Sequence, residues 1–147
     1  MKKSELTKED ILSDRMGVKC LIFDFDGTIA ETEEAHRNAF NKAFVLNKLN
    51  WHWDQHIYKK LLKVAGGKER IEFYNKSLLS HSKQISGKDI EEIHFQKTKF
   101  YSQSVSQGFV HLRPGIREFL AKVKYNKKKL AISTSTSRDN VTLLLRS

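Results

Sequence analysis

The sequence contains a single cysteine, at position 20, so the chain can form no internal disulfide bond. One cysteine inside an apolar run suits a reducing compartment. The sequence also lacks an apolar run long enough to span a membrane, and we expect no membrane partner. Its first residues are charged and partly acidic, so we expect neither a signal peptide nor a transit peptide. We therefore expect a cytoplasmic protein.

The charge is strongly unbalanced. Lys and Arg number 27 against 17 Asp and Glu, which gives a formal net charge of +10. Such an excess attracts anions, including phosphorylated metabolites and nucleic acid. Because the cations are spread along the chain, we favour a solvated basic surface over nucleic-acid binding.

Two short apolar runs, 18–25 and 128–134, predict β-strands, and apolar residues at helical spacing predict helices between and after them. The first expected helix covers 31–48. A second is capped by Asp54 and ended by Gly66-Gly67, and a third starts near Lys68. A longer helix covers about 88 to 106, with Ile90, Ile93, Lys97 and Phe100 in phase; one more is opened by Pro114-Gly115, and the last residues begin a final helix. Strands separated by helices favour a parallel sheet of the α/β class.

The length of 147 residues fits one domain, or a small domain with an insertion. The block 38–107 is longer than a simple crossover between parallel strands needs. We therefore expect an N-terminal extension over 1–16, an α/β core formed by 17–37 and 108–147, and an inserted helical block over 38–107.

The most specific motif follows the first predicted strand. Asp24 and Asp26 alternate along an extended chain, so their carboxylates lie on one side and need a cation or a shared proton. Ligands bind beyond the carboxyl ends of parallel strands. An aspartate there can attack phosphorus, and a second one can protonate the leaving alkoxide and then activate water. Mg²⁺ would neutralise the carboxylate and phosphate charges together, and Gly27 would allow a tight turn.

A second interpretation competes with the catalytic one. It takes the motif as an acidic turn, or a Ca²⁺ loop, after a strand. The spacing of a Ca²⁺ loop does not continue from Asp26, so the catalytic interpretation is favoured.

Several stretches resemble known families. "LIFDFDGT", "LAIST" (130–134) and "RPG" (113–115) resemble the haloacid dehalogenase superfamily of phosphohydrolases. "AETEEAHRNAFNKAF", "WHWD" and "GGKERI" resemble its CbbY-like branch, sugar-bisphosphate phosphatases that act on xylulose 1,5-bisphosphate. This resemblance implies a Rossmann-like parallel-sheet core with an inserted α-helical cap, a phosphorylated sugar as partner and Mg²⁺ as cofactor. It also implies a chloroplast stromal location if the source is a photosynthetic eukaryote.

The resemblance also implies roles for residues of the first motif. Asp24 would be the nucleophile and Asp26 the general acid/base. The carboxylate of Asp24 and the backbone carbonyl of Asp26 would be Mg²⁺ ligands. Gly27 and Thr28 would belong to the substrate-binding and phosphate-binding loop.

The second strand end provides candidates for holding the phosphoryl group, Thr134 and Ser135. A hydroxyl at a strand end, beside the backbone N–H groups that open a helix, is an anion site. An ordinary helix cap is the alternative, and both interpretations stay open.

Two further groups are candidates by resemblance. Glu31, Glu34 and His36 would contact substrate hydroxyls, or would form a solvated first helical turn, where Glu is favoured. Gly67, Lys68 and Arg70 would bind the non-reacting phosphate of a bisphosphate, or would mark an ordinary Gly-Gly helix break. The latter group is not a P-loop, because the required spacing is absent.

Two motifs that the superfamily needs, a lysine and a later acidic strand end, do not follow Thr134. We therefore expect a C-terminally truncated monomer with an incomplete core, whose sheet exposes an apolar edge and face. Its enzymatic activity stays open. The alternative is an inactive fragment that binds only an anion or a sugar phosphate, and less favoured is a basic nucleic-acid-binding protein. Phosphatase and phosphomutase activities are not distinguished.

Overall fold

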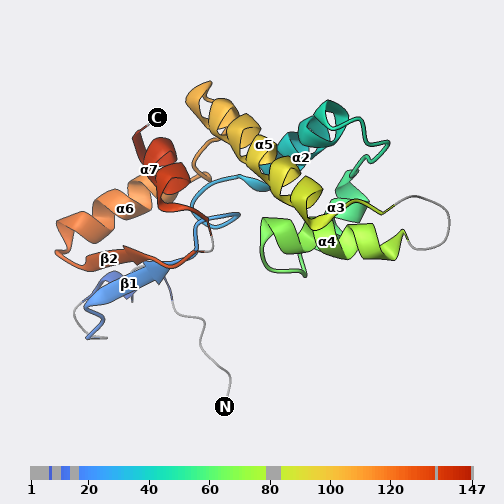
Figure 1. Ribbon diagram of the computed structural model, residues 1–147. Coiled ribbons are helices and arrows are strands. Elements are labelled where there is room, and N and C mark those ends of the chain that lie inside the picture. Colours follow the sequence, from blue (N-terminus) through green and yellow to red (C-terminus); the bar gives the residue numbers. More distant parts are fainter. Residues whose placement is uncertain (1–6, 8–10, 14–16, 79–83, 135, 147) are drawn as a thin grey trace, which may run out of the picture. The chain divides into compact units, whose positions relative to one another are not determined.

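A computed structural model describes residues 7, 11–13, 17–78, 84–134 and 136–146 (Figure 1). The chain divides into two compact units. The first consists of Met1–Glu31 and Leu112–Thr134, and the second of Thr32–His111 and Ser135–Ser147. Most of the predicted N-terminal extension, 1–16, lies outside the described residues.

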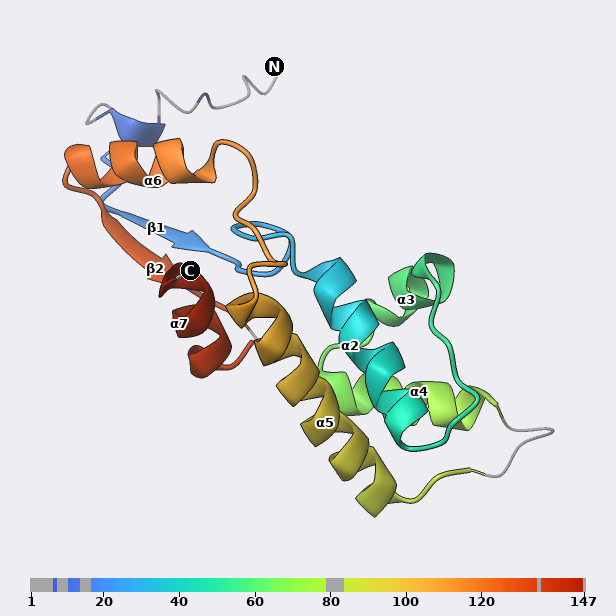
Figure 2. The same cartoon turned by 90° about the horizontal axis from the view of Figure 1, so that it is seen from above.

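The first unit is built on two parallel strands, β1 (Cys20–Phe23) and β2 (Lys129–Ile132), which lie side by side in both views (Figure 1 and Figure 2). Phe23 pairs with Ile132 in register. Helix α6 (Ile116–Tyr125) precedes β2, and its Phe119 packs edge-on against Phe23 with ring centroids 5.9 Å apart. The predicted parallel pairing is therefore confirmed.

One face of this small sheet is apolar and exposed. Ile22 is 69% exposed, and its register partner Ala131 is exposed on the same face. Two strands and one helix can cover one face of a sheet but not both, so the exposed face follows from the small number of strands in the described part of the chain. This confirms the exposed apolar face that the sequence predicts.

The second unit is helical in its described residues. Its helices are α2 (Glu33–Leu46), α3 (Gln55–Leu61), α4 (Gly67–Ser77), α5 (Gly87–Ser106) and α7 (Arg138–Arg146). Helices α2 and α5 pack side by side (Figure 2). The core that they share with α3 and α4 consists of Phe40, Ala43, Phe44, Trp53, Tyr58, Leu61, Ile71, Ile90 and Ile93. The periodicity of apolar residues predicted each of these helices.

Helix ends explain where the sequence prediction succeeds and fails. The Asp54 carboxylate accepts a hydrogen bond from the Ile57 N–H at 2.7 Å, so the predicted N-cap of α3 is confirmed. The expectation that Gly66-Gly67 ends that helix is wrong, because α3 already ends at Leu61. Gly66 is instead the N-cap of α4, with a φ of 90° that favours glycine.

The observed division differs from the predicted domain boundaries. It falls after Glu31 and before Leu112, and it places 135–147 with the helical unit. Helix α7 packs on α5, where the Ser102 hydroxyl donates to Asn140 Oδ1 at 3.2 Å. The assignment of a catalytic core and a cap to these segments stays a prediction. None of the helices in the described residues is long and apolar enough to cross a membrane.

Candidate functional site

The two predicted motifs of the first unit meet at one edge of the sheet. The Ser133 N–H donates to the Phe23 carbonyl at 2.8 Å, directly after the last register pair of the two strands. Asp24 and Thr134 therefore leave neighbouring parallel strands at the same, carboxyl-terminal edge. This is the edge where α/β sheets bind ligands. Ser135 lies outside the described residues.

A tight turn shapes the loop that carries the two aspartates. The Phe25 carbonyl accepts from the N–H groups of Ile29 at 2.9 Å and Ala30 at 3.2 Å. Gly27, whose φ is 71°, donates its N–H to the Ala30 carbonyl at 2.8 Å. The Phe25 ring is fully buried, whereas Asp24 is exposed and Asp26 is half-buried. The buried Phe25 ring thus anchors the loop between the two aspartates.

The oxygen donors of this loop suit a hard cation. The described residues contain no group of three or more His, Cys, Asp or Glu side chains that could hold a metal ion. Mg²⁺, however, commonly binds through one or two carboxylates and completes its octahedron with water and substrate phosphate oxygens. Asp24 and Asp26 offer that kind of donor set, so the residues fit the implied ion.

The remaining candidates of the first unit lie on the same loop. Thr28 is exposed. The Glu31 carboxylate forms an ion pair with Arg113, with 3.0 Å between Oε1 and Nε. Glu31 thus has a charged partner in the same unit, although its carboxylate is more than half exposed.

His36 lies in the second unit, on α2, and it has a partner that sequence reasoning missed. Its Nδ1 is 2.9 Å from Nζ of Lys97, and its ring stacks on Tyr101 with centroids 3.9 Å apart. Lys97 is only 8% exposed, with Nζ 4.9 Å from the centroid of the Phe40 ring. The position of Lys97 in the apolar stripe of a predicted helix was the sequence signal that could have identified it as a buried partner.

Glu34, by contrast, is tied into the helical unit. Both its carboxylate oxygens accept hydrogen bonds from the Arg37 guanidinium, which holds the pKa of Glu34 below its usual range. Arg37 also donates to the Trp53 carbonyl at 2.8 Å. These contacts favour a structural role for Glu34.

The predicted second anion site lies at the start of α4, and its charged side chains have internal partners. Arg70 Nε donates to the Val64 carbonyl at 2.8 Å, which braces the loop before the helix. Lys68 Nζ lies 3.6 Å from a carboxylate oxygen of Glu91. Gly67 packs against the ring of His94, so closely that a Cβ atom there would lie 2.6 Å from Nε2.

The pKa of His94 is affected by burial and by the lysines around it. Burial lowers the pKa of His94, and the nearby charges of Lys97 and Lys68 lower it further, whereas Glu69 opposes them. Both effects favour the neutral form of the ring.

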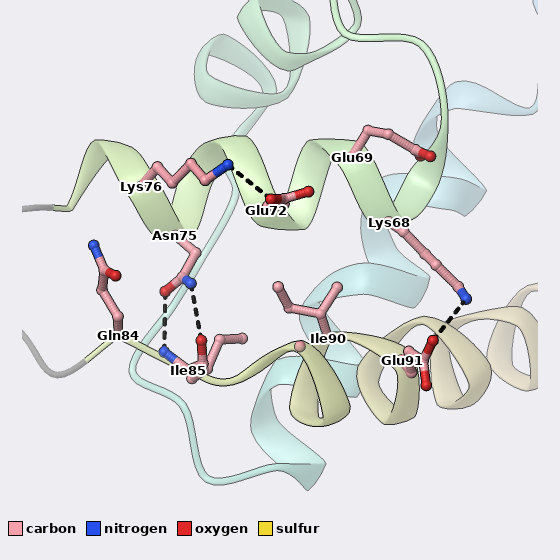
Figure 3. Close-up of a pocket in the computed structure, with 10 residues that line it drawn as sticks. Lys68, Glu69, Glu72, Asn75, Lys76, Gln84, Ile85, Ile90 and Glu91 are labelled. Atoms are coloured by element: carbon pink, nitrogen blue, oxygen red, sulfur yellow. Dashed lines mark hydrogen bonds and ion pairs between the residues drawn. The ribbon is translucent and has the colours of Figure 1, made fainter.

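A pocket of about 460 Å³ opens between α4 and the start of α5 (Figure 3). Asn75 supports its wall by exchanging two hydrogen bonds of 3.1 Å with the backbone of Ile85. Three glutamates and two lysines line the pocket, so its charge does not favour a phosphate group. Of the predicted site residues, only Lys68 lines it.

A family model described as haloacid dehalogenase-like hydrolase matches residues 21–147. The chain belongs to this family. The match covers both strand-end motifs and the whole helical unit, so the predicted membership is confirmed.

Relatives of this hydrolase family member support the predicted branch. The chain is 42% identical to the CbbY protein of Rhodobacter capsulatus over 130 residues, which are 88% of this chain and 56% of that protein. It is 32% identical to a CBBY-like protein of Arabidopsis thaliana over 131 residues, 85% of this chain and 41% of the relative. The chain thus spans about half the length of these relatives.

Solved structures agree. CbbY from Rhodobacter sphaeroides, in complex with phosphate, superimposes with a TM-score of 0.77 at 40% identity, over 88% of this chain and 56% of that one. A mutant of the same protein, in complex with xylulose-(1,5)bisphosphate, gives a TM-score of 0.77 at 39% identity, with the same coverage of both chains. The predicted fold class, an α/β fold of the Rossmann-like kind with an incomplete sheet, is confirmed.

Proposed function

We propose that this chain carries the nucleophile-bearing part of a Mg²⁺-dependent phosphatase that acts on a phosphorylated sugar such as xylulose 1,5-bisphosphate. The observation that carries the proposal is the meeting of Asp24 and Thr134 at the carboxyl edge of β1 and β2. The identity of 42% to a CbbY protein supports the substrate class, since a related CbbY binds xylulose bisphosphate.

The proposed reaction has two steps, both centred on the loop after β1. The Asp24 carboxylate attacks phosphorus, the bond from phosphorus to the sugar oxygen breaks, and Asp26 gives its proton to that oxygen. Asp26 then takes a proton from a water molecule that attacks the aspartyl-phosphate, which releases phosphate and restores Asp24. Mg²⁺, when bound to the Asp24 carboxylate and the Asp26 carbonyl, would neutralise charge on the phosphate.

Other residues would bind the substrate. Thr134 and Ser135 would donate hydrogen bonds to the transferring phosphoryl group, beside the loop of Gly27 and Thr28. Glu31 and His36 would contact sugar hydroxyls. Gly67, Lys68 and Arg70 would hold the non-reacting phosphate, which requires Lys68 to exchange its present partner Glu91 for the ligand.

Covalent trapping tests the proposal directly. The chain is incubated with Mg²⁺ and phosphorus-labelled xylulose bisphosphate, quenched in acid, and analysed for label that hydroxylamine releases, as expected of an acyl phosphate. Asp24→Asn should abolish the label, since no carboxylate remains to attack. Asp26→Asn should slow release of the label by about 10²- to 10⁴-fold, because it removes the general base.

Asp139→Asn, at an exposed carboxylate of α7, is the matched control and should label like the parent chain. A parent chain that binds the bisphosphate in calorimetry but takes no label would instead support the alternative of a binding-only protein. Label that persists in Asp24→Asn would contradict the assigned nucleophile.

A further inference from the structure

Arg113 makes three separate contacts with the loop that carries the aspartates, although it lies far along the chain. Its backbone N–H donates to the Ile29 carbonyl at 2.9 Å. Its guanidinium Nη1 donates to the carbonyl of Gly27, which lies 86 positions away in sequence. Its Nε lies 3.0 Å from a carboxylate oxygen of Glu31.

These contacts complete a brace around the turn. The neighbouring residue Leu112 forms an antiparallel bridge with Ala30, and Ala30 in turn accepts from the Gly27 N–H at 2.8 Å. The peptide group before Gly27 is thus held from inside the loop, and the peptide group after it is held by Arg113. Since Gly27 has a φ of 71°, a region that glycine enters freely, its own backbone does not fix the loop.

The chemistry of the contact suits arginine in particular. A guanidinium presents several N–H donors in a fixed plane, so it can serve a carbonyl and a carboxylate at the same time. A bond from a charged donor to the Gly27 carbonyl is stronger than one between neutral groups. The pair with Glu31 is half-exposed and contributes little by itself, but it orients the guanidinium plane.

We propose that Arg113 is a positioning residue, which fixes the peptide group after Gly27, one residue beyond Asp26, and holds Glu31 beside it. The catalytic part of this inference rests on the proposed function. The structural part, that the guanidinium holds the loop 24–31, does not. Removing the side chain should release the acid/base loop without removing any group that touches the substrate.

Hydrogen exchange tests the structural part on the whole chain, with or without turnover. Arg113→Ala should accelerate amide exchange in the peptide 24–31 by at least about tenfold relative to the peptide 129–134. Arg113→Lys should give an intermediate acceleration, because an ammonium group keeps the charge but cannot reproduce the planar fork. Arg117→Ala, which removes an exposed arginine of α6, should leave the loop as in the parent chain.

Kinetics tests the catalytic part. Arg113→Ala should lower kcat by about 10- to 100-fold, as expected when a reacting group is misplaced, with a smaller rise in KM because Glu31 is released as well. Arg113→Lys should recover part of kcat.

The outcomes separate the two proposals. Unchanged exchange of 24–31 in Arg113→Ala would overturn the inference, whatever the activity of the chain. Faster exchange in a chain that never forms an aspartyl-phosphate would overturn the proposed function and leave the role of Arg113 as a loop brace standing. An unchanged kcat in Arg113→Ala, in a chain whose loop exchanges faster, would overturn the positioning of Asp26.

Discussion

At the scale of single residues, His94 makes stability depend on pH. Burial and the charges of Lys97 and Lys68 lower its pKa, so the folded chain keeps a neutral ring where an unfolded chain takes up a proton. Its contribution to the free energy of unfolding is complete above about pH 6.5, the ordinary value. It is lost as pH falls from there toward the lowered pKa of the folded state.

Urea unfolding at several pH values between about 7.5 and 5 checks this prediction. The parent chain should lose stability toward the acid end, and His94→Gln should lose less, because glutamine binds no proton in either state. The comparison concerns the dependence on pH, so a constant loss of packing in the variant does not disturb it. An equal dependence in both chains would show that His94 is not the group responsible.

The residues that sequence reasoning missed are those whose role depends on a distant partner. Lys97 contacts His36 across 61 positions, and Arg113 contacts Gly27 across 86. Periodicity places Lys97 on a buried stripe, and resemblance marks Arg113 only as part of "RPG". Neither pattern contains the partner, because only the packed chain brings these groups together. Asp24 and Asp26 were found because their pattern is local.

At the scale of elements, two glycines that begin helices allow a matched comparison. Gly67 is the first residue of α4, and Gly87 is the first residue of α5. A Cβ at Gly67 would lie 2.6 Å from Nε2 of His94, whereas a Cβ at Gly87 would meet nothing within 4 Å. We expect Gly67→Ala to destabilise the chain by about 1–3 kcal/mol through overpacking. Gly87→Ala should stabilise it by about 0.4–1 kcal/mol by restricting the unfolded chain.

Denaturant unfolding of the two variants checks the direction of each change. A second step identifies the cause of the first effect: in a His94→Ala background, Gly67→Ala should lose most of its penalty, which a double-mutant cycle measures as coupling. Penalties of equal size with and without His94 would mean that the ring is not the obstacle.

The elements themselves were largely predictable, whereas their ends were less so. Helices α2 and α5 follow from apolar spacing over several turns, and Asp54 follows from its capping chemistry. The end of α3 at Leu61 was missed, because Gly66 and Gly67 looked like a stop signal. A glycine signals a change of backbone direction, but it does not show whether it ends the helix before it or begins the helix after it.

At the scale of the whole molecule, the family and its fold class could be predicted, and the grouping of segments could not. Helix α7 groups with the helical unit, although the sequence order of strand and helix suggested the α/β core. Its packing on α5 depends on contacts such as that between Ser102 and Asn140, which no local pattern reveals. The chain also spans about half the length of the relatives it matches.

The two units should differ in stability, because their cores differ. Around Phe40 and Ile93, which are fully buried, the helical unit has a contiguous aromatic and aliphatic cluster. The strand unit has a two-stranded sheet whose Ile22 is 69% exposed, and two strands are marginal by themselves. Native-state amide exchange should therefore be slower in α2 and α5 than in β1 and β2.

A pair of truncations sharpens this last prediction. Ile93→Ala should remove about 2–5 kcal/mol of protection from α2 and α5, because it opens a cavity in the cluster. Ile22→Ala, at an exposed position of the same residue type, should change protection by no more than about 0.5 kcal/mol. If the strands prove as well protected as the helices, and Ile93→Ala lowers the protection of both equally, the chain unfolds as one cooperative body and the predicted difference is wrong.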